Sequence, residues 1–366
     1  MITKIKILSD DLHVYFNGQD SELFPNIWLR DHAKDEVNWD KRSNQRKTFT
    51  ASLDTKLKIK KAEIIENGRC LSVLWPDLKK PVIYSSDFLM KNKLNYVKKN
   101  LSNYKIWKSN EIGDDIFVNF NSILSKEGFK KFLNKLNTFG FLVIKNCETN
   151  INSVEKVANK IGYVRNSIFG GLWSFESNEN KADSSYTQEE LRPHTDAIYS
   201  NDAPGLQLLL CCEYDASGGE SIMVDGLKIA QEIKKQSQSM FDLLSKINVK
   251  GNYVGDGVIL EAERPIFKLN NYNEIVQVSF NNYDRAPFRF TKELTLKFYE
   301  AIKKFDLIAN NKDYQWRHIL RPGELLIFNN WRILHGRSSF KGIRKISGCY
   351  INKEDFDSCC KMNEIN

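Results

Sequence analysis

The chain carries Arg192-Pro193-His194-Thr195-Asp196, and this stretch decides which fold and which chemistry the rest of the chain must support. Side chains alternate between the two faces of an extended strand, so His194 and Asp196 point the same way and can reach one metal ion together. Because a His-x-Asp triplet also arises by chance in surface turns, a third ligand is needed from elsewhere in the chain.

A segment near the C-terminus supplies that ligand. In residues 330–337 (NWRILHGR), His335 ends an apolar run, and Arg344 follows nine residues later. Two imidazoles and a carboxylate that leave coordination positions open form the facial triad of non-haem Fe(II) oxygenases. We therefore predict that His194, Asp196 and His335 are the metal-binding and catalytic residues. The remaining histidines lack such a context and are interpreted as ordinary core or surface residues: His13, His32 and His318.

Length and composition suit a soluble protein of two domains. The chain has 366 residues, of which 41% are hydrophobic and 12% aromatic, enough for a large core. No apolar run approaches the roughly 18 residues of a membrane span, and the first residues lack the apolar core of a signal peptide. The sequence therefore predicts a cytoplasmic protein with no membrane partner.

Charge and cysteine content narrow the class further. The net charge of +8 fits either nucleic-acid binding or a lysine-rich solubilising surface. Since the lysines are scattered along the chain, we favour the second and expect no nucleic-acid partner. The seven cysteines show no CxxC spacing. The adjacent pairs Cys211-Cys212 and Cys359-Cys360 suit neither ordinary disulfides nor zinc, so reduced thiols are expected.

Hydrophobic periodicity predicts a mainly β protein with supporting helices. Residues 1–105 contain short alternating segments at 57–60 and 71–75, which indicate a small β-rich N-terminal domain, and residues 91–110 read as a Lys/Asn-rich linker. The strands expected in residues 106–366 are 141–144, 206–212, 221–224, 276–280, 325–328 and 346–351, and the helices are 129–136, 154–161, 227–233 and 294–305. Many strands with few helices predict a jelly roll (a double-stranded β-helix) with the His-x-Asp triplet near its mouth.

These residues give the chain a resemblance to the γ-butyrobetaine and trimethyllysine dioxygenases, within the taurine-dioxygenase-like superfamily of Fe(II)/2-oxoglutarate oxygenases. The related trimethylaminoethylphosphonate hydroxylases have the same architecture. The trimethyllysine branch is the more similar, through residues 281–285 and 348–350. The matching stretches cover nearly the whole chain: 28–32 (WLRDH), 75–77 (WPD), 194–196 (HTD), 218–219 (GG), 224–226 (VDG), 280–285 (FNNYDR), 330–332 (NWR), 335–337 (HGR) and 348–350 (GCY).

The resemblance implies Fe(II), 2-oxoglutarate as cosubstrate, and O2. Arg344 matches the arginine that binds the distal carboxylate of 2-oxoglutarate in the family, and a guanidinium suits a carboxylate because the two can form paired hydrogen bonds. Arg337 is the alternative for this role. Ser221 is a further cosubstrate-binding candidate, as a hydrogen-bond donor to the same ligand.

The resemblance also implies an aromatic cage for a quaternary ammonium group, which donates no hydrogen bond and is attracted by aromatic faces. Four aromatic residues and one acid match cage positions of the family: Phe169, Trp173, Tyr186, Tyr350 and Asp183. Tyr199 and Asn281 would contact the polar end of the substrate. Phe169 stands where the family has a tyrosine. Ala197 replaces a tyrosine that helps γ-butyrobetaine enzymes hold the substrate carboxylate, which argues against that substrate.

The N-terminal domain departs from the family pattern. Relatives often hold zinc there through cysteines after Leu-Arg-Asp and a histidine after Trp-Pro-Asp, but residues 33–37 (AKDEV) and 78–81 (LKKP) fill these places. Without a thiol or imidazole at these positions, three or four zinc ligands cannot be assembled. We expect no structural zinc, and we expect this domain to depend on its own core or on the partner subunit of a homodimer.

Together these features predict a 2-oxoglutarate-dependent dioxygenase that hydroxylates a small trimethylammonium compound, trimethyllysine- or γ-butyrobetaine-like as in carnitine biosynthesis, and releases succinate and CO2. One alternative substrate is 2-trimethylaminoethylphosphonate, whose phosphonate Arg285 and Arg289 would bind. Another alternative is a non-catalytic betaine-binding protein with the same barrel, against which the intact ligand set argues. A nucleic-acid oxygenase fits less well, because the predicted aromatics surround an acid that repels phosphate.

Overall fold

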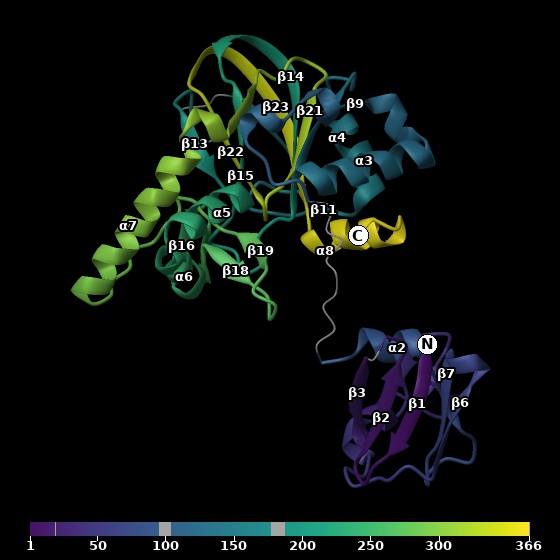
Figure 1. The fold of residues 1–366 in the computed structure, drawn as a ribbon. Helices are drawn as coiled ribbons and strands as arrows, with labels where there is room; N and C mark the ends of the chain where they lie inside the picture. The colour runs from purple at the N-terminus through teal and green to yellow at the C-terminus, as the bar shows by residue number, and fades with distance from the viewer. Residues whose placement is uncertain (19, 95–103, 177–186, 366) are drawn as a thin grey trace. The chain divides into compact units, whose positions relative to one another are not determined.

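The computed structural model describes residues 1–18, 20–94, 104–176 and 187–365. The chain divides into two compact units, Met1–Asn100 and Leu101–Asn366 (Figure 1). The division that we placed at residue 105 from the sequence falls here after Asn100. Each unit has its own apolar core, and each is described by itself.

The N-terminal unit contains two antiparallel three-stranded sheets with the orders β1-β2-β3 and β6-β7-β8. Along β2 the buried Leu12, Val14 and Phe16 alternate with less buried residues, as expected for a strand with one face on a core. The elements are β1 (Ile2–Ile7), β2 (Asp11–Phe16), β3 (Ser21–Pro25), α1 (Asn26–Asp31), β4 (Trp39–Asp40), β5 (Gln45–Arg46), β6 (Lys61–Ile65), β7 (Cys70–Leu74), β8 (Val82–Ser85) and α2 (Ser86–Lys91).

The strand predicted at residues 57–60 is wrong. The side chain of Asp54 accepts a hydrogen bond from the backbone N–H of Lys56, and its carbonyl accepts one from Leu57. These bonds close a turn at Leu57. The N–H of Lys60 is already bonded to the carbonyl of Leu74, but β6 begins only at Lys61.

Apolar side chains and an arginine fill the region around residues 33 and 78. Ala33 is buried in the apolar core, and Leu78 packs against that core. The buried guanidinium of Arg30 donates to the carboxylate of Asp77 at 2.6 Å and to the side chain of Asn38 at 3.0 Å. A charge-assisted pair of this kind ties the turn after β7 to helix α1.

The C-terminal unit confirms the predicted jelly roll with supporting helices (Figure 1). The large sheet has the order β11-β23-β14-β21-β10-β9, with β12 also paired to β23, and the small sheet has the order β13-β22-β15-β20. The strands are β9 (Phe117–Asn119), β10 (Phe141–Lys145), β11 (Val164–Arg165), β12 (Leu172–Glu176), β13 (Leu191–His194), β14 (Leu206–Gly218), β15 (Ser221–Asp225), β20 (Gln315–His318), β21 (Leu325–Asn329), β22 (Ile333–Arg337) and β23 (Phe340–Ile351).

Helices cover the outer faces of the sheets, and two short hairpins extend the small-sheet side. The sequence analysis missed the hairpin β16–β17 and helix α6, and it extended β19 by two residues. The remaining elements are α3 (Lys126–Phe139), α4 (Ile151–Ile161), α5 (Gly226–Gln236), α6 (Gln238–Lys246), β16 (Asn248–Gly255), β17 (Val258–Pro265), β18 (Phe267–Leu269), β19 (Ile275–Val278), α7 (Lys292–Ala309) and α8 (Lys353–Met362). Within the described residues, none of the helices is long and apolar enough to cross a membrane.

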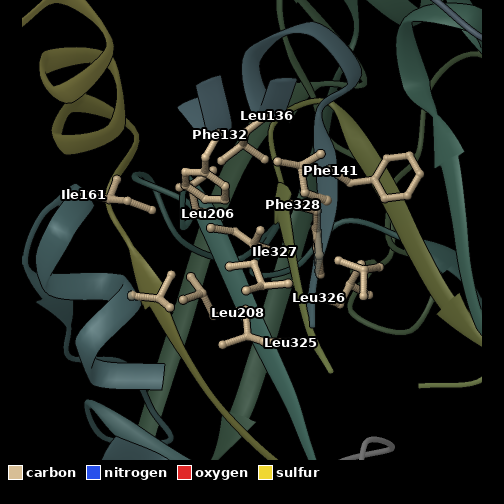
Figure 2. Close-up of a cluster of buried hydrophobic side chains, with 14 of the residues drawn as sticks. Phe132, Leu136, Phe141, Ile161, Leu206, Leu208, Leu325, Leu326, Ile327 and Phe328 are labelled. Carbon is tan, nitrogen blue, oxygen red and sulfur yellow. The ribbon is translucent and has the colours of Figure 1, made fainter. Parts of the chain in front are cut away.

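The core of the large sheet lies between the strands and helices α3 and α4 (Figure 2). Helix α3 begins where the Ser125 side chain accepts a hydrogen bond from the N–H of Gly128, and it ends at Gly140, whose φ of 80° is left-handed. Its buried residues Phe132 and Leu136 are four apart, so they share the face that meets the sheet. This packing fixes the large sheet, whose strands β14, β21 and β23 also contribute residues to the chamber over the ligand residues.

Candidate active site

The three predicted ligand residues lie together at the edge of the small sheet. His194 ends β13 and stands opposite His335 of β22 in the antiparallel ladder. Oδ1 of Asp196 lies 3.4 Å from Nε2 of His194 and 3.5 Å from Nε2 of His335. One candidate ligand atom from each residue lies within 4.8 Å of the others, which is close enough for one metal ion to contact all three.

The strand that carries the triplet is shorter than predicted, because β13 ends at His194. Hydrogen bonds of Thr195 nevertheless keep Asp196 on the same side of the chain as His194. The backbone N–H of Thr195 donates to the carbonyl of Phe280 at 2.7 Å, and its hydroxyl accepts from the N–H of Phe280 at 2.9 Å. The same bonds draw Phe280 away from β19, which is why that strand stops at Val278. Ala197 then turns the chain with a left-handed φ of 56°.

Hydrogen bonds from neighbouring groups orient the ligand atoms. Nδ1 of His194 lies 2.8 Å from the carbonyl oxygen of Arg192, which can only accept, so Nδ1 carries a proton and Nε2 is the nitrogen turned toward Asp196. The side chain of Asn330 accepts from the N–H of Asp196 and donates to its carbonyl. The hydroxyl of Tyr350 donates to Oδ2 of Asp196 at 2.8 Å, so that Oδ1 faces the two histidines.

The protonation states of Asp196 and His335 fit a divalent cation. Burial raises the pKa of the Asp196 carboxyl, but the charges and hydrogen bonds of His335 and His194 outweigh it and hold this pKa well below its usual range. Burial lowers the pKa of His335 to about 4. Burial also lowers the pKa of His194, and the hydrogen bond with Asp196 reverses this, so its net shift is upward. At neutral pH an ionised Asp196 and a neutral His335 are the forms that bind metals.

A chamber opens directly over these ligands. Its lining residues include Arg344, Ser221 and Arg337 as well as several aromatic residues. Its walls are formed by Phe169, Phe175, Leu191, His194, Asp196, Ala197, Tyr199, Gln207, Leu209, Ser221, Met223, Asn281, Tyr283, Asp284, Leu326, His335, Gly336, Arg337, Arg344, Ile346 and Tyr350. All three cosubstrate candidates and four of the seven substrate candidates therefore meet in one space.

The two candidate arginines differ in what they already bind. An Nη of Arg337 donates to the carbonyl oxygens of Thr187 and Glu189 at 2.6 and 2.8 Å. Arg344 on β23 forms no ion pair with any carboxylate of the described residues, and desolvation lowers the pKa of its guanidinium. A desolvated cation that faces a cavity is ready to receive an anion. Ser221 of β15 is buried and lines the same chamber.

The predicted cage residues fall into three groups. Phe169 and Tyr350 line the chamber. Trp173 of β12 is only 5% exposed and lies behind the lining, with its ring 4.4 Å from that of Phe175 and 5.7 Å from that of Tyr350. Phe175 takes the lining place instead. The other two predicted cage residues lie outside the described residues: Asp183 and Tyr186.

The sequence analysis did not name Phe175. Its position could have been found from that of Trp173, because residues 173 and 175 share one face of a strand.

The predicted contacts for the polar end of the substrate, Tyr199 and Asn281, also line the chamber. The Asn281 amide donates to Oδ2 of Asp284 at 2.8 Å, and its oxygen accepts from the N–H of Tyr283. Asp284 therefore brings a carboxylate to the chamber wall, and the sequence analysis did not single it out. The ring of Tyr283 packs edge-on against His194 at 5.7 Å.

The fold and the ligand set together define an Fe(II)- and 2-oxoglutarate-dependent oxygenase. A model of the family described as taurine catabolism dioxygenase TauD, TfdA family matches residues 105–350, and the chain belongs to this family. It is thus a dioxygenase that uses Fe(II), 2-oxoglutarate and O2. When bound, Fe(II) activates O2 and couples the oxidation of 2-oxoglutarate to succinate and CO2 with oxidation of the substrate.

The comparisons also identify full-length relatives. The chain is 30% identical over 344 residues to the mitochondrial trimethyllysine dioxygenase of Rattus norvegicus, which covers 91% of this chain and 80% of that protein. It is 29% identical over 386 residues to the trimethyllysine dioxygenase of Meyerozyma guilliermondii, and the match covers 100% of this chain and 96% of that protein. It is 25% identical over 346 residues to the human gamma-butyrobetaine dioxygenase, and the match covers 92% of this chain and 89% of that protein.

Solved structures support the fold. A putative alpha-ketoglutarate-dependent taurine dioxygenase from Burkholderia xenovorans superposes with a TM-score of 0.51 at 11% identity, and covers 64% of this chain and 86% of that one. An asparagine oxygenase in complex with Fe(II), 3-hydroxyasparagine and succinate gives a TM-score of 0.50 at 14% identity, over 63% and 81% of the two chains.

Proposed function

We propose that this dioxygenase hydroxylates a small trimethylammonium compound, with trimethyllysine as the preferred substrate class. The observation that carries the proposal is a chamber in which aromatic rings and a metal-ligand set face the same space. The rings of Phe169, Phe175 and Tyr350 offer faces to a cation that cannot donate hydrogen bonds, each worth roughly 0.5–2 kcal/mol. The proposal also assigns Asp183 and Tyr186 to this cage.

The cosubstrate occupies the arginine-lined part of the chamber in this proposal. Arg344 binds the distal carboxylate of 2-oxoglutarate, because its guanidinium faces the chamber and has no ion-pair partner among the described residues. Ser221 donates a hydrogen bond to the same carboxylate. Arg337 has a supporting role, since its contacts with Thr187 and Glu189 tie down the segment that enters β13.

Two features favour an amino acid over γ-butyrobetaine. Ala197 lacks the hydroxyl that γ-butyrobetaine enzymes would need from a tyrosine at this place, and its left-handed φ of 56° places it in a tight turn. Asp284 presents a carboxylate at the chamber wall. The α-ammonium group of trimethyllysine is attracted by such an acid, whereas γ-butyrobetaine has only a carboxylate at that end.

The residues that line the chamber itself do not support the phosphonate alternative. Neither Arg285 nor Arg289 is among the residues that line the chamber. The guanidinium of Arg285 lies 5.5 Å from the ring of Phe288 and 5.9 Å from that of Tyr299 instead. A non-catalytic betaine-binding protein would have no use for three side chains, His194, Asp196 and His335, whose ligand atoms lie close enough to hold one metal ion.

The cytoplasmic location and the homodimer also belong to this proposal. All seven cysteines are free thiols, and burial raises the pKa of Cys147, Cys349 and Cys360 to about 12, which suits a reducing compartment. Sedimentation equilibrium at micromolar concentration tests the homodimer, and a monomeric mass would contradict it.

A substrate panel with succinate release as readout tests the proposed function. Desolvation of a primary ammonium is not compensated by aromatic faces, because they accept no strong hydrogen bond, whereas a trimethylated cation loses less hydration. We expect trimethyllysine to exceed lysine by at least about tenfold in kcat/KM. An enzyme that converts lysine equally well, or that converts only neutral compounds, would show that the chamber rings are ordinary core.

A further inference from the structure

One buried cation of the C-terminal unit takes no part in the site described above. Arg264 near the end of β17 is 8% exposed, yet neither Nη1 nor Nη2 has a hydrogen-bond partner among the described residues. Burial lowers the pKa of this guanidinium, but an arginine side chain remains charged at neutral pH. The acid that acts on its charge, Asp202, forms its ion pair with Arg165 at 2.7 Å. A buried charge in this state needs an anion.

The surroundings of Arg264 are suited to an anion. It lines a small cavity, here called the Arg264 cavity, together with Ser279, Asn281, Asn282 and Arg285. Two arginines, a serine and two asparagines thus line this cavity, and no carboxylate is among the lining residues. The rest of the lining is apolar: Ile198, Val249, Ile266, Phe280 and Ile302. The cavity measures about 20 Å³, more than the roughly 10–15 Å³ that one water needs and too little for a bulky group.

The Arg264 cavity adjoins the chamber over the metal ligands. Asn281 lines both spaces. Ile198 lines the Arg264 cavity, while its chain neighbours Ala197 and Tyr199 line the chamber. The two spaces therefore meet at Asn281, which was assigned above to the polar end of the substrate.

We propose that the Arg264 cavity binds the carboxylate of the trimethylammonium substrate, an inference that rests on the proposed function. Arg264 supplies a guanidinium that can form paired hydrogen bonds with a carboxylate, and Asn281 lines both its cavity and the chamber. The aromatic rings bind one end of the substrate and Arg264 the other. Fixing both non-reacting ends aims one C–H bond at the metal site.

The test compares two substrates that differ only in the carboxylate: trimethyllysine and its decarboxylated analogue, 5-(trimethylammonio)pentylamine. Loss of one partner of a buried ion pair weakens binding by at least about 30-fold. In the wild type we therefore expect trimethyllysine to exceed the analogue by at least about 30-fold in kcat/KM. Arg264→Met should remove this preference by raising the KM for trimethyllysine alone, Arg264→Lys should restore part of it, and the KM for 2-oxoglutarate should stay unchanged.

A matched control is Lys268→Met, which removes an exposed cation four residues further along the chain. Equal losses on both substrates in Arg264→Met would overturn the proposal and leave Arg264 a structural residue. If Arg264→Met fails to fold, the two substrates are compared in the wild-type enzyme alone. Equal kcat/KM for trimethyllysine and its decarboxylated analogue there would overturn the proposal. Preference for 2-trimethylaminoethylphosphonate would overturn the carboxylate assignment. If no trimethylammonium compound is converted, the proposed function itself fails, and this inference fails with it.

Discussion

At the scale of single residues, Tyr350 joins two parts of the site. Its ring lines the chamber, as predicted for a cage residue, but its hydroxyl also donates to Oδ2 of the proposed metal ligand Asp196 at 2.8 Å. Partners that orient metal ligands typically account for about 10–100-fold in metal affinity or activity. Tyr350 therefore acts on the metal site as a positioning residue, and on the substrate through its ring.

We expect Tyr350→Phe to weaken metal binding while it spares substrate binding. The variant keeps the ring and removes only the hydroxyl, so the dissociation constant for Co(II), followed by absorbance, should rise at least about tenfold. The KM for trimethyllysine should change by less than about threefold, because the cation–π contact remains. Tyr272→Phe, which alters an exposed ring, is the control. Unchanged metal affinity with a raised substrate KM would restrict Tyr350 to the cage.

The two chamber arginines make opposite predictions for the cosubstrate. Arg344→Met leaves a buried carboxylate of 2-oxoglutarate unpaired, at a cost of about 2–5 kcal/mol, so its KM should rise at least about 30-fold. Arg337→Met should raise that KM much less, because its Nη is already bound to the Thr187 and Glu189 carbonyls. Steady-state kinetics at saturating trimethyllysine measures both. The opposite order of effects would move the cosubstrate site to Arg337.

Sequence patterns gave the residues of the site more readily than their roles. His194, Asp196 and His335 could be identified because ligand chemistry and local spacing are written in the chain itself. Arg264 could not, since its surroundings come from β17, from residues 279–285 and from Ile198, and no local pattern reports that its guanidinium lacks a partner. Asp284 was likewise within a recognised motif, but only the fold turns its carboxylate toward the chamber.

At the scale of elements, the pairing of β12 with β23 decides which aromatic residue reaches the chamber. Trp173 stands opposite Gly348 in this ladder, and its ring packs over that glycine. Phe175, two residues on, lines the chamber instead. Periodicity places both residues on one face of a strand but does not say where along the strand the chamber lies. That information depends on the register with β23, which is a long-range feature.

This packing predicts a strong effect of one methyl group. In Gly348→Ala the added Cβ would meet the Trp173 ring and the backbone carbonyl of Leu208, and the backbone of β14 cannot retreat inside a paired sheet. Overpacking of this kind costs about 1–3 kcal/mol of unfolding free energy. Urea denaturation measures it, with Gly113→Ala as the control, since nothing lies within 4 Å of its added Cβ. Equal stability of the two variants would show that Trp173 moves easily.

At the scale of the whole molecule, the two compact units differ in what stabilises them. The unit Met1–Asn100 has an apolar core that includes Ala33, and Leu78 packs against this core. The unit Leu101–Asn366 carries all three proposed metal ligands. Units with separate cores tend to unfold separately, and a ligand stabilises only the native state that binds it. Metal dependence should therefore be confined to one unit.

We expect calorimetry to show two transitions, of which the larger unit gives the one with the larger enthalpy. Mn(II) with 2-oxoglutarate at about a hundredfold above their dissociation constants should stabilise that transition by about 2.7 kcal/mol per bound ligand. His335→Ala should remove the metal-dependent part. Zinc added after chelation should leave the smaller transition in place, since residues 33–37 and 78–81 offer no thiol or imidazole. A zinc-dependent rise in the midpoint temperature of the smaller transition would reveal zinc ligands elsewhere in that unit. A single transition would mean that the two units unfold together.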